Sequence, residues 1–357
     1  MNICLFNSCN SWGGGEKWHF ETAKNLSRIG YNVTLCAQPK SALANKIVAE
    51  KLSHSFVKVR PRSFLNPFKI FLLVRLFRAQ QIDVIILALS SDVKLAGIAA
   101  KLAGVPKIIY RKGSAVVVRN TWLNRLLYRK VITDIITNSE EIKRKLLERN
   151  RNFKPSSKIH ILYNGVELSK FSPLHANGHS GKTIILGSAG RMVKQKGQHF
   201  LLEIAKILKE KNFDFQLKIA GIGPLLLPLK KQAAKLNVTD KVEFCGFVDD
   251  VPTFLNNLDV FLLTSLHEGS SNILLEAMAC GKPVVAFNIS SIPELISNDV
   301  NGYLVGFGQC EQFADKILEL ANKPDLITEF GKNSRELSSN KFSLEHSLVR
   351  LQEIIRS

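Results

Sequence analysis

The sequence has no long hydrophobic run. A membrane-spanning helix needs about 18 or more apolar residues in succession, and no stretch of the 357 residues approaches that length. Residues 1–6 are an apolar segment that leads into a glycine turn, which is typical of a first strand and not of a signal peptide. We therefore expect a protein that stays in the cytoplasm.

The sequence also lacks the cysteine spacing of a metal site. None of its cysteines forms a Cys-x-x-Cys pair or has a histidine partner at metal-ligand spacing. The six cysteines are Cys4, Cys9, Cys36, Cys245, Cys280 and Cys310. Several of them fall in apolar segments, so we expect reduced, buried thiols.

A third absence is the dinucleotide-binding pattern Gly-x-Gly-x-x-Gly. Gly13, Gly14 and Gly15 stand at a predicted strand-to-helix turn and are followed by Glu16, but no glycine follows at the required spacing. A nicotinamide or flavin cofactor is therefore not predicted. Two interpretations of the three glycines stay open: they let the backbone approach a ligand, or they form a tight turn with positive φ.

The net excess of positive charge is confined to the N-terminal half. Residues 1–166 hold 28 Lys and Arg against 9 Asp and Glu, a net charge of +19, whereas residues 167–357 hold 21 of each kind. Such a one-sided field attracts an anionic partner. Nucleic acid is not predicted, because no recognition motif is present and aromatic residues do not alternate with the basic ones.

Two basic, aromatic segments favour a membrane surface or a phosphorylated acceptor as that partner. Residues 67–78 and 119–130 have helical periodicity and carry Arg and Lys beside Phe, Trp and Tyr, as interfacial helices do. The alternative is that both are ordinary outer helices of an α/β domain, with one buried and one solvated face.

Apolar strands alternate with helical segments along the chain, which predicts parallel sheets wound with helices. The length suits two domains, and the polar segment 172–182 is the predicted linker. The expected strands are residues 3–7, 33–37, 84–89, 107–111, 135–138, 184–188, 216–220, 242–245, 260–264 and 283–287.

Glu268 and Glu276 stand on either side of a predicted strand-to-helix turn. Ser270 or Ser271 is a suitable N-cap for a helix that includes Glu276. The N–H groups and dipole of that helix can hold a diphosphate, while the two carboxylates accept hydrogen bonds from sugar hydroxyls. A capped helix with two structural carboxylates is the alternative.

A second group of residues lies upstream. Gly190, Arg191 and Lys196 follow a predicted strand and precede a helical run over residues 200–208. Two fixed cations at the end of a strand suit a leaving diphosphate, because Arg binds it in a bidentate manner and Lys acts as a point charge. Cations in such a loop are also commonly only solvated.

Taken together, these residues resemble the retaining glycosyltransferases of family 4, also called glycosyltransferases group 1. The resemblance is densest over residues 164–305. Its motifs are Gly190-Arg191 with Lys196-Gly197, residues 220–224, residues 242–247, Glu268 with Glu276, Ile292-Pro293-Glu294 and Asn301-Gly302. Residues 12–16, 138–140 and 163–166 extend it to the N-terminal half.

The resemblance implies an α/β fold of the GT-B type, with two Rossmann-like, doubly wound parallel-sheet domains that face a central cleft. Residues 1–166 would bind the acceptor and residues 167–338 the nucleotide sugar. Residues 339–357 would form a C-terminal helix that packs back on the first domain.

It also implies a role for each matching residue. The catalytic residues would be Arg191, Lys196 and Glu268. The donor-binding residues would be Gly14, Gly15, Gly190, Gly221, Phe247, Ser270, Ser271, Asn272 and Glu276. The acceptor-binding residues would be Glu16, Arg111 and Lys112. Many family members have a histidine in the loop where this sequence has residues 109–114, so the usual histidine contact is in doubt and Arg111 and Lys112 suggest an anionic acceptor.

The expected activity is transfer of a hexose-like sugar, with retention, from a UDP-linked donor to a hydroxyl of an anionic or lipid-linked glycan. Lipopolysaccharide core or surface polysaccharide synthesis is the preferred pathway, at the inner face of the cell membrane. No metal or other cofactor is expected, and Asp249-Asp250 is expected to be a loop feature. Two rivals are a sugar-nucleotide epimerase of the same fold and a non-enzymatic basic protein that binds membranes or glycans.

Overall fold

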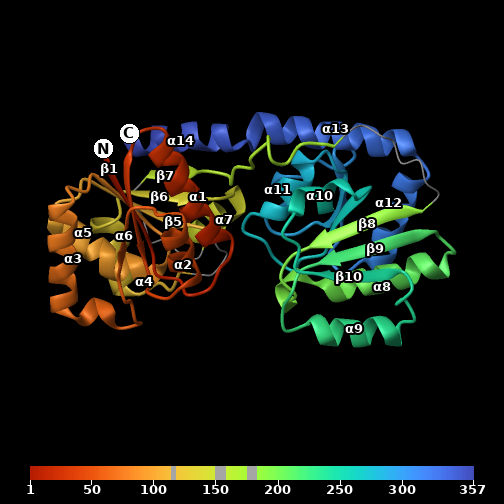
Figure 1. Cartoon of the computed structure of the whole chain (residues 1–357), viewed down its shortest axis with the longest axis horizontal. Coiled ribbons are helices and arrows are strands. Elements are labelled where there is room, and N and C mark those ends of the chain that lie inside the picture. The colour runs from red at the N-terminus through yellow and green to blue at the C-terminus, as the bar shows by residue number, and fades with distance from the viewer. Residues whose placement is uncertain (114–117, 149–157, 175–182) are drawn as a thin grey trace. The chain divides into compact units, whose positions relative to one another are not determined.

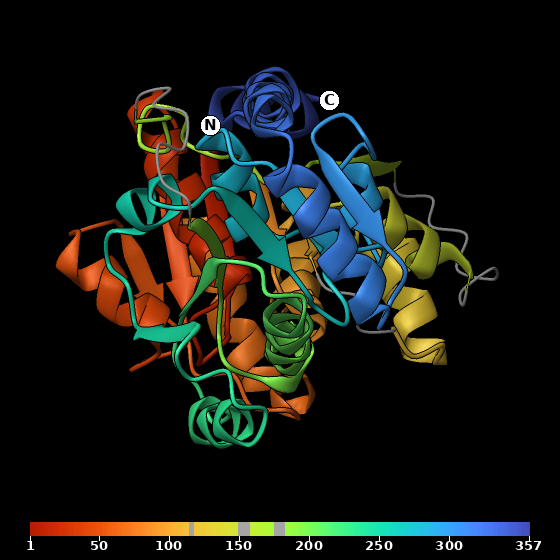
Figure 2. The ribbon, with the colours of Figure 1, turned by 90° about the vertical axis from the view of Figure 1, so that its right-hand side faces the viewer.

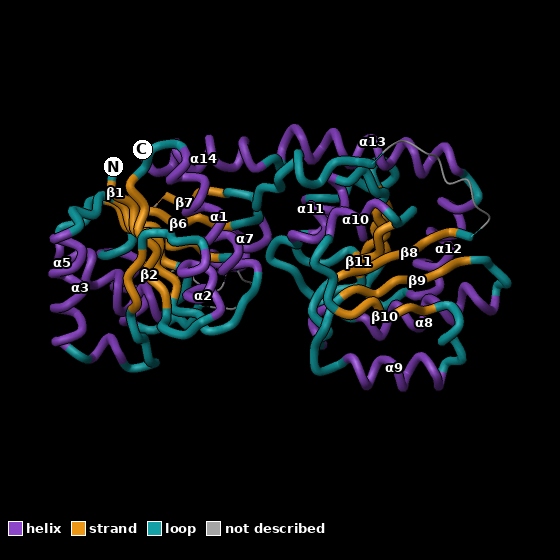
Figure 3. The backbone as a smooth tube through the Cα atoms, viewed as in Figure 1, coloured by secondary structure: helices purple, strands orange, loops and turns teal. Residues whose placement is uncertain are grey.

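A computed structural model describes residues 1–113, 118–148, 158–174 and 183–357. The chain forms two compact units: unit 1 comprises Met1–Asn164 with Ser347–Ser357, and unit 2 comprises Gly165–His346. Figure 1 labels their elements, and Figure 3 shows strands with helices on both faces in each unit.

Unit 1 is built on a seven-stranded parallel sheet of order β3-β2-β1-β4-β5-β6-β7. Its strands are β1 (Asn2–Asn7), β2 (Asn32–Ala37), β3 (His54–Phe56), β4 (Val84–Leu87), β5 (Lys107–Lys112), β6 (Asp134–Thr137) and β7 (Lys158–Ile161). The first six strands have the order of a Rossmann fold, with the switch point between β1 and β4.

Helices cover both faces of this sheet. They are α1 (Gly14–Arg28), α2 (Ala42–Ala49), α3 (Pro67–Ala79), α4 (Ser90–Asp92), the π-helical turn η2 (Val93–Gly97), α5 (Ile98–Ala103), α6 (Trp122–Lys130), α7 (Glu140–Glu148) and the end of α14 (Leu344–Arg356), with a short 3-10 turn η1 (Ser63–Leu65). Buried residues of α1, α2 and α14 share one core, and those of α3, η2, α5 and α6 share the other.

Unit 2 repeats the plan with a six-stranded parallel sheet of order β10-β9-β8-β11-β12-β13. Its strands are β8 (Ile184–Ala189), β9 (Phe215–Ala220), β10 (Val242–Gly246), β11 (Val260–Leu263), β12 (Val284–Phe287) and β13 (Gly302–Val305). The strand order is again that of a Rossmann fold, and the switch point lies between β8 and β11.

The helices of unit 2 are α8 (Gln198–Glu210), α9 (Leu226–Lys235), α10 (Val251–Asn256), α11 (Asn272–Ala279), α12 (Cys310–Ala321), α13 (Pro324–Lys341) and the start of α14, with 3-10 turns η3 (Lys194–Lys196) and η4 (Ile292–Glu294). Helices α8 and α12 pack side by side, as Figure 2 shows in green and blue. Helix α11 packs between α10 and α13.

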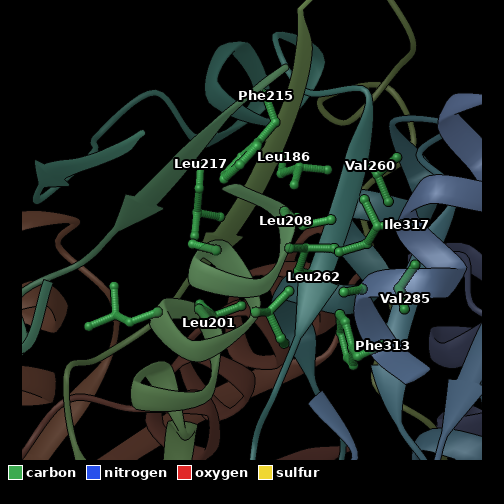
Figure 4. Packing of buried hydrophobic residues seen from close by; sticks show 14 of the residues in the cluster. Leu186, Leu201, Leu208, Phe215, Leu217, Val260, Leu262, Val285, Phe313 and Ile317 are labelled. Atoms are coloured by element: carbon green, nitrogen blue, oxygen red, sulfur yellow. The ribbon is translucent and has the colours of Figure 1, made fainter. Parts of the chain in front are cut away.

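A large apolar core lies between the unit 2 sheet and helices α8 and α12. Figure 4 shows Leu201 and Leu208 of α8 and Phe313 of α12 directed at Leu217 and Leu262 of the strands. All are fully or almost fully buried. Because a parallel sheet covered on both faces needs nearly continuous apolar strands, this core explains why the strands were recognisable in the sequence.

The structure confirms the predicted fold class and all ten predicted strands, and it adds the short edge strands β3, β7 and β13. The units divide after Asn164 and after His346, where the sequence analysis placed boundaries after 166 and 338. Two contacts account for the positions: Val166 N donates to Phe342 O at 2.8 Å, and Leu344 N donates to Val166 O at 2.9 Å, so Val166 and residues 342–344 belong to the same unit. The predicted linker lies outside the described residues from 175 onward.

The C-terminal helix packs on unit 1, as expected. Its last turns bury Leu351, Ile354 and Ile355 in the core shared with α1 and α2. Arg356 also donates to the Tyr31 hydroxyl oxygen through Nε at 3.2 Å and Nη2 at 2.9 Å.

Two further expectations concern cysteines and membrane spans. All six cysteines are free thiols, but only Cys4, Cys36 and Cys280 are buried. The expectation of burial is therefore wrong for the other three, because they lie in loops or at element ends at the surface. None of the helices in the described ranges has both the length and the apolar character that crossing a bilayer requires.

Candidate active site

The carboxyl edge of the unit 2 sheet brings together the two segments singled out in the sequence. The loop after β8 and the loop after β11 are joined by three hydrogen bonds. Leu266 N donates to Gln195 O at 2.8 Å, Gln195 Nε2 donates to His267 O at 3.0 Å, and Thr264 Oγ1 donates to Gly197 O at 3.1 Å. The two loops therefore form one structure at the switch point, where ligands of doubly wound sheets bind.

Glycines make this close approach possible. Gly197 has φ +62°, and a Cβ there would lie 2.0 Å from Thr264 O. Gly221 has φ +134°, and a Cβ there would lie 2.0 Å from Gly190 O. Because both positions combine a left-handed backbone with no room for a side chain, only glycine allows the backbones to approach this closely.

Lys196 and Glu268 form an ion pair in this structure. Lys196 Nζ lies 2.7 Å from Glu268 Oε1, and the same oxygen accepts a 2.6 Å hydrogen bond from Ser265 Oγ. Both charged side chains are largely buried. Lys196, the predicted cation for the diphosphate, and Glu268, the predicted sugar ligand, are in direct contact across 72 residues of sequence.

Arg191 differs from Lys196 in its surroundings. Its side chain is exposed, and no ion pair holds it among the residues that the structure describes. Its backbone is fixed, since Arg191 O accepts a 2.9 Å hydrogen bond from Gln198 Nε2. The guanidinium is therefore available to a ligand at the carboxyl edge.

The N-terminus of α11 lies between the two glutamates, and Ser271 is its N-cap residue, as predicted. The Ser271 side chain makes no capping hydrogen bond, so the expectation that a serine side chain caps this helix is wrong for Ser271. The hydroxyl oxygens of Ser270 and Ser271 are both buried and have no partner in the described part of the chain. Buried hydroxyls normally have a partner, so two unsatisfied hydroxyls at a helix N-terminus suit an anionic ligand.

Most of the other predicted donor residues lie in the same unit. Asn272 begins α11, and Glu276 is buried in its second turn. Phe247 follows β10, and its ring is exposed. Gly190 directly follows β8, next to the Lys196 side chain. The remaining two, Gly14 and Gly15, lie in unit 1, at the start of α1.

The carboxyl edge of the unit 1 sheet holds two buried cations, as Arg111 and Lys112 end β5. Arg111 Nη2 donates to Asn164 Oδ1 at 2.8 Å, and the guanidinium carbon lies 4.1 Å from the centre of the Trp18 ring. Burial lowers the pKa of Arg111, and it lowers the pKa of Lys112 to about 8. The Glu16 carboxylate opposes the lowering of the Arg111 pKa and so compensates part of this buried charge. A buried region with two adjacent cations still suits an anionic ligand.

Glu16 supplies a single carboxylate to this region. It is buried in the first turn of α1 and accepts a 3.4 Å hydrogen bond from Asn7 Nδ2. None of Gly13, Gly14 and Gly15 has positive φ, so the tight-turn interpretation is wrong. A Cβ on Gly15 would meet nothing within 4 Å, which leaves open space beside the backbone.

The fold adds residues that the sequence analysis missed. No histidine is near Arg111 in sequence, but His19 of α1 is close in space: burial and the charge of Arg111 lower its pKa to about 3. Its Nδ1 lies 3.0 Å from Gly15 O, and its Nε2 is buried without a partner among the described residues. The sequence held no signal for this, since α1 and β5 meet only in the folded unit.

Asp92 was also missed. It is fully buried just after β4, and its carboxyl accepts hydrogen bonds from Ser8 N at 3.3 Å and Leu89 N at 3.0 Å and bonds the Ser8 hydroxyl. Burial raises the pKa of Asp92 to about 7. Asp92 thereby fastens the loop that follows β1, which leads to the three glycines, to the loop after β4.

Known proteins are similar to this chain in sequence and in fold. Residues 174–337 match the family model described as glycosyl transferases group 1, and residues 12–170 match the model of glycosyltransferase family 4. The chain belongs to this family of glycosyltransferases, and its fold is GT-B.

Three similar proteins illustrate the family. The capsular polysaccharide biosynthesis glycosyltransferase CapM of Staphylococcus aureus is 30% identical over 222 residues, 59% of this chain and 58% of CapM. An Escherichia coli enzyme, UDP-Gal:alpha-D-GlcNAc-diphosphoundecaprenol alpha-1,3-galactosyltransferase, is 26% identical over 302 residues, 79% of this chain and 77% of that protein. The crystal structure of HepE from Anabaena in complex with UDP has a TM-score of 0.87 and 19% identity, with all of both chains covered.

The residues that the structure describes include no group of three His, Cys, Asp or Glu that could hold a metal ion. Asp249 and Asp250 lie in the loop between β10 and α10, where Asp250 caps α10 by accepting from Thr253 N at 3.2 Å. The expected loop role of Asp250 is therefore confirmed.

Proposed function

We propose that this chain transfers a sugar from a nucleoside-diphosphate sugar to a hydroxyl of an anionic or lipid-linked surface glycan, with retention of anomeric configuration. The observation that carries the proposal is the carboxyl edge of unit 2. There, the exposed Arg191 and the Lys196–Glu268 pair lie in the joined loops after β8 and β11, and two unsatisfied serine hydroxyls lie at the N-terminus of α11.

In the proposed reaction, Arg191 and Lys196 stabilise the diphosphate as it leaves. The bond between the anomeric carbon and the diphosphate oxygen breaks, and a bond from the same carbon to the acceptor oxygen forms on the same face of the sugar. The acceptor proton passes to an oxygen of the leaving phosphate, so the step uses no separate base and no metal ion. Fixed cations are most effective here because charge develops on the leaving group in the transition state.

The Lys196–Glu268 contact supports a second feature of the proposal. Glu268 has a second carboxylate oxygen beyond the one bonded to Lys196 and Ser265, and it would accept hydrogen bonds from the donor sugar. Lys196 would contact the diphosphate while paired to Glu268. Glu276 would accept hydrogen bonds from the two ribose hydroxyls. Ser270, Ser271 and the N–H groups of the first turn of α11 would donate hydrogen bonds to the phosphates.

UDP is the proposed nucleotide. The similar Anabaena protein binds UDP in its crystal structure, and the name of the similar Escherichia coli enzyme specifies a UDP-linked sugar. Phe247 is an exposed ring beside the carboxyl edge and is suited to contact the base.

The proposed acceptor carries a phosphate or carboxylate. Support comes from Arg111 and Lys112, which are buried cations at the edge of the unit 1 sheet, near the open space at Gly15. The names of similar proteins refer to capsular polysaccharide and to a diphosphoundecaprenol-linked sugar. We therefore propose a lipid-linked precursor as the acceptor and a peripheral location on the inner face of the cell membrane.

The test is to incubate the protein with radiolabelled nucleotide sugars, with and without a lipid extract. The proposal predicts transfer that depends on the extract, with the anomeric configuration of the donor retained when the product is examined by NMR. An isomerised nucleotide sugar formed without acceptor would show the rival epimerase, and no reaction with any donor would favour the non-enzymatic binding protein. An inverted product would contradict the retaining step.

A further inference from the structure

Two helices of unit 1 expose an unusual set of large apolar side chains. On α6, Trp122 is 74% exposed, and on α3, Phe68 is 66% exposed. Phe71, Leu72 and Leu126 are also exposed on the same two helices. Scattered single apolar residues are normal on a protein surface, but a concentration of large ones marks an interaction site.

Both helices lie on one face of the unit 1 sheet. Leu73 and Phe77 of α3 and Leu127 and Tyr128 of α6 are buried in the same core, and both helices pack against η2 between them. Figure 1 shows α3, α5 and α6 in the same part of unit 1. Since the buried sides of α3 and α6 point into one core, their exposed sides point away from it together.

The charge of this face is of one sign. Residues 51–82 and 93–133, which include α3, η2, α5 and α6, contain no Asp or Glu but seven and nine Lys and Arg, respectively. Arg75, Arg125 and Arg129 are exposed on the same two helices as the apolar side chains. Arg75 lies over the Phe71 ring, 6.0 Å from its centre.

Helix α7 of the same unit differs from α3 and α6 in that its basic residues form ion pairs within the helix. Its Arg144 and Lys145 pair with Glu141 of the same helix, one turn away. Such pairs are typical of a helix that faces only water. If α3 and α6 were ordinary outer helices, we would expect ion pairs within them as in α7. Neither helix contains an acidic residue that could form such a pair.

We propose that the exposed faces of α3 and α6 form a membrane-docking surface that inserts Phe68, Phe71 and Trp122 into a bilayer containing acidic lipids. Aromatic rings favour the level of the headgroups, and the neighbouring arginines contact the acidic lipids. A nucleic acid would use the charge but not the aliphatic Leu72 and Leu126. The inference deepens the proposed lipid-linked acceptor, but vesicle binding needs neither donor nor acceptor, so either proposal can fail without the other.

Trp122 allows a direct test, because it is the exposed one of three tryptophans: Trp18 is buried and Trp12 is half-buried. The full chain is mixed with vesicles of phosphatidylcholine alone or with added phosphatidylglycerol. The proposal predicts sedimentation and a blue-shifted emission only with the acidic vesicles, and quenching by lipids brominated in the acyl chain. The Trp122→Phe variant should lose the shift and the quenching while still sedimenting.

Matched variants separate insertion from charge. Phe68→Ser with Phe71→Ser should weaken vesicle binding by at least about tenfold, whereas Leu227→Ser with Phe307→Ser, two exposed apolar residues of unit 2, should not change it. Arg75→Glu with Arg129→Glu should abolish binding, whereas Lys231→Glu with Lys235→Glu on α9 should leave most of it. Circular dichroism and UDP affinity verify that each variant is folded.

Three results would overturn the proposal: no binding to acidic vesicles at low salt, equal binding to neutral vesicles, or binding without any change in Trp122 emission. The last result would mean that the basic half only adsorbs to the headgroups and that the apolar residues cover something else.

Discussion

The sheets of the two units share the strand order of a Rossmann fold, but the cations at their carboxyl edges have different surroundings. In unit 2, the largely buried cation Lys196 is paired with Glu268 at 2.7 Å, and the loops around it approach closely at glycines that have no room for a Cβ. In unit 1, Arg111 and Lys112 are buried side by side, and the backbone at Gly15 borders open space.

This difference suggests how one architecture performs two tasks. A preorganised, internally neutralised site suits a small donor that is bound in a single geometry, because little reorganisation is left for the reaction. A site with two adjacent buried cations and open space suits an anionic acceptor of larger and more variable shape.

The largest expected effect is on turnover. Arg191→Ala and Lys196→Ala should each lower kcat by about 10²-fold or more, because each removes a charge that stabilises the leaving group. Circular dichroism should show an intact fold for Arg191→Ala, since that side chain is exposed. Near-normal turnover of both variants with an active donor would show that the leaving-group assignment is wrong.

The glycines should respond in opposite ways. In Gly221→Ala, the new Cβ would lie 2.0 Å from Gly190 O at a residue with φ +134°, which should cost about 2–4 kcal/mol of unfolding free energy and weaken UDP binding. Gly15→Ala meets nothing within 4 Å and lies in α1, so stability should rise by about 0.5–1 kcal/mol. The transfer activity of Gly15→Ala should nevertheless fall, because the methyl group would occupy space that the acceptor fills in the proposed reaction.

Chemical denaturation measures the change in unfolding free energy of each variant, and calorimetry measures its affinity for UDP. If Gly15→Ala were as active as the wild type, the open space at this residue would have no role in substrate binding.

A smaller effect should appear in the pH dependence of acceptor use. The pKa of Lys112 is lowered to about 8 by burial, so its charge is lost as pH rises through about 8. KM for an anionic acceptor should therefore rise between pH 7 and pH 9, while KM for the donor stays nearly constant. In Lys112→Met, the acceptor KM should be high at both pH values, and a wild-type pH profile in that variant would exclude Lys112 as the titrating group.

The smallest effect concerns Asp92 and stability. Its pKa is raised from 3.8 to about 7 in the folded chain, so the folded state binds more protons than the unfolded state between these values. The stabilisation is thus complete below about pH 3.8 and is lost as pH rises through about 7. Asp92→Asn should flatten the fall in Tm between pH 5 and pH 8, and Asp83→Asn at the opposite edge of the same sheet serves as the control.

Much of the fold could be predicted because buried parallel strands are nearly continuous apolar runs. All ten predicted strands are present, whereas β3, β7 and β13 were missed. Strand β3 has only three residues, and β7 alternates polar and apolar residues at a sheet edge, so neither has the apolar run of a central strand.

The composition of the candidate site was harder to predict. Local patterns indicated Arg191, Lys196, Glu268 and Glu276, because each lies beside a recognisable strand or helix end. Their contacts were not predictable in the same way. Lys196 pairs with Glu268 across 72 positions, and His19 approaches Arg111 across about 90, and local patterns in a single sequence do not show which distant residues meet.

The division of labour between the units is the central claim, and calorimetric titration of UDP into three proteins tests it most directly. Wild type and Arg111→Met should bind UDP with equal affinity, because Arg111 belongs to unit 1. Glu276→Gln should bind it several-fold to tenfold more weakly, because an amide offers one acceptor oxygen to the ribose hydroxyls instead of two. Equal UDP affinity in wild type and Glu276→Gln, with a loss in Arg111→Met, would contradict the account.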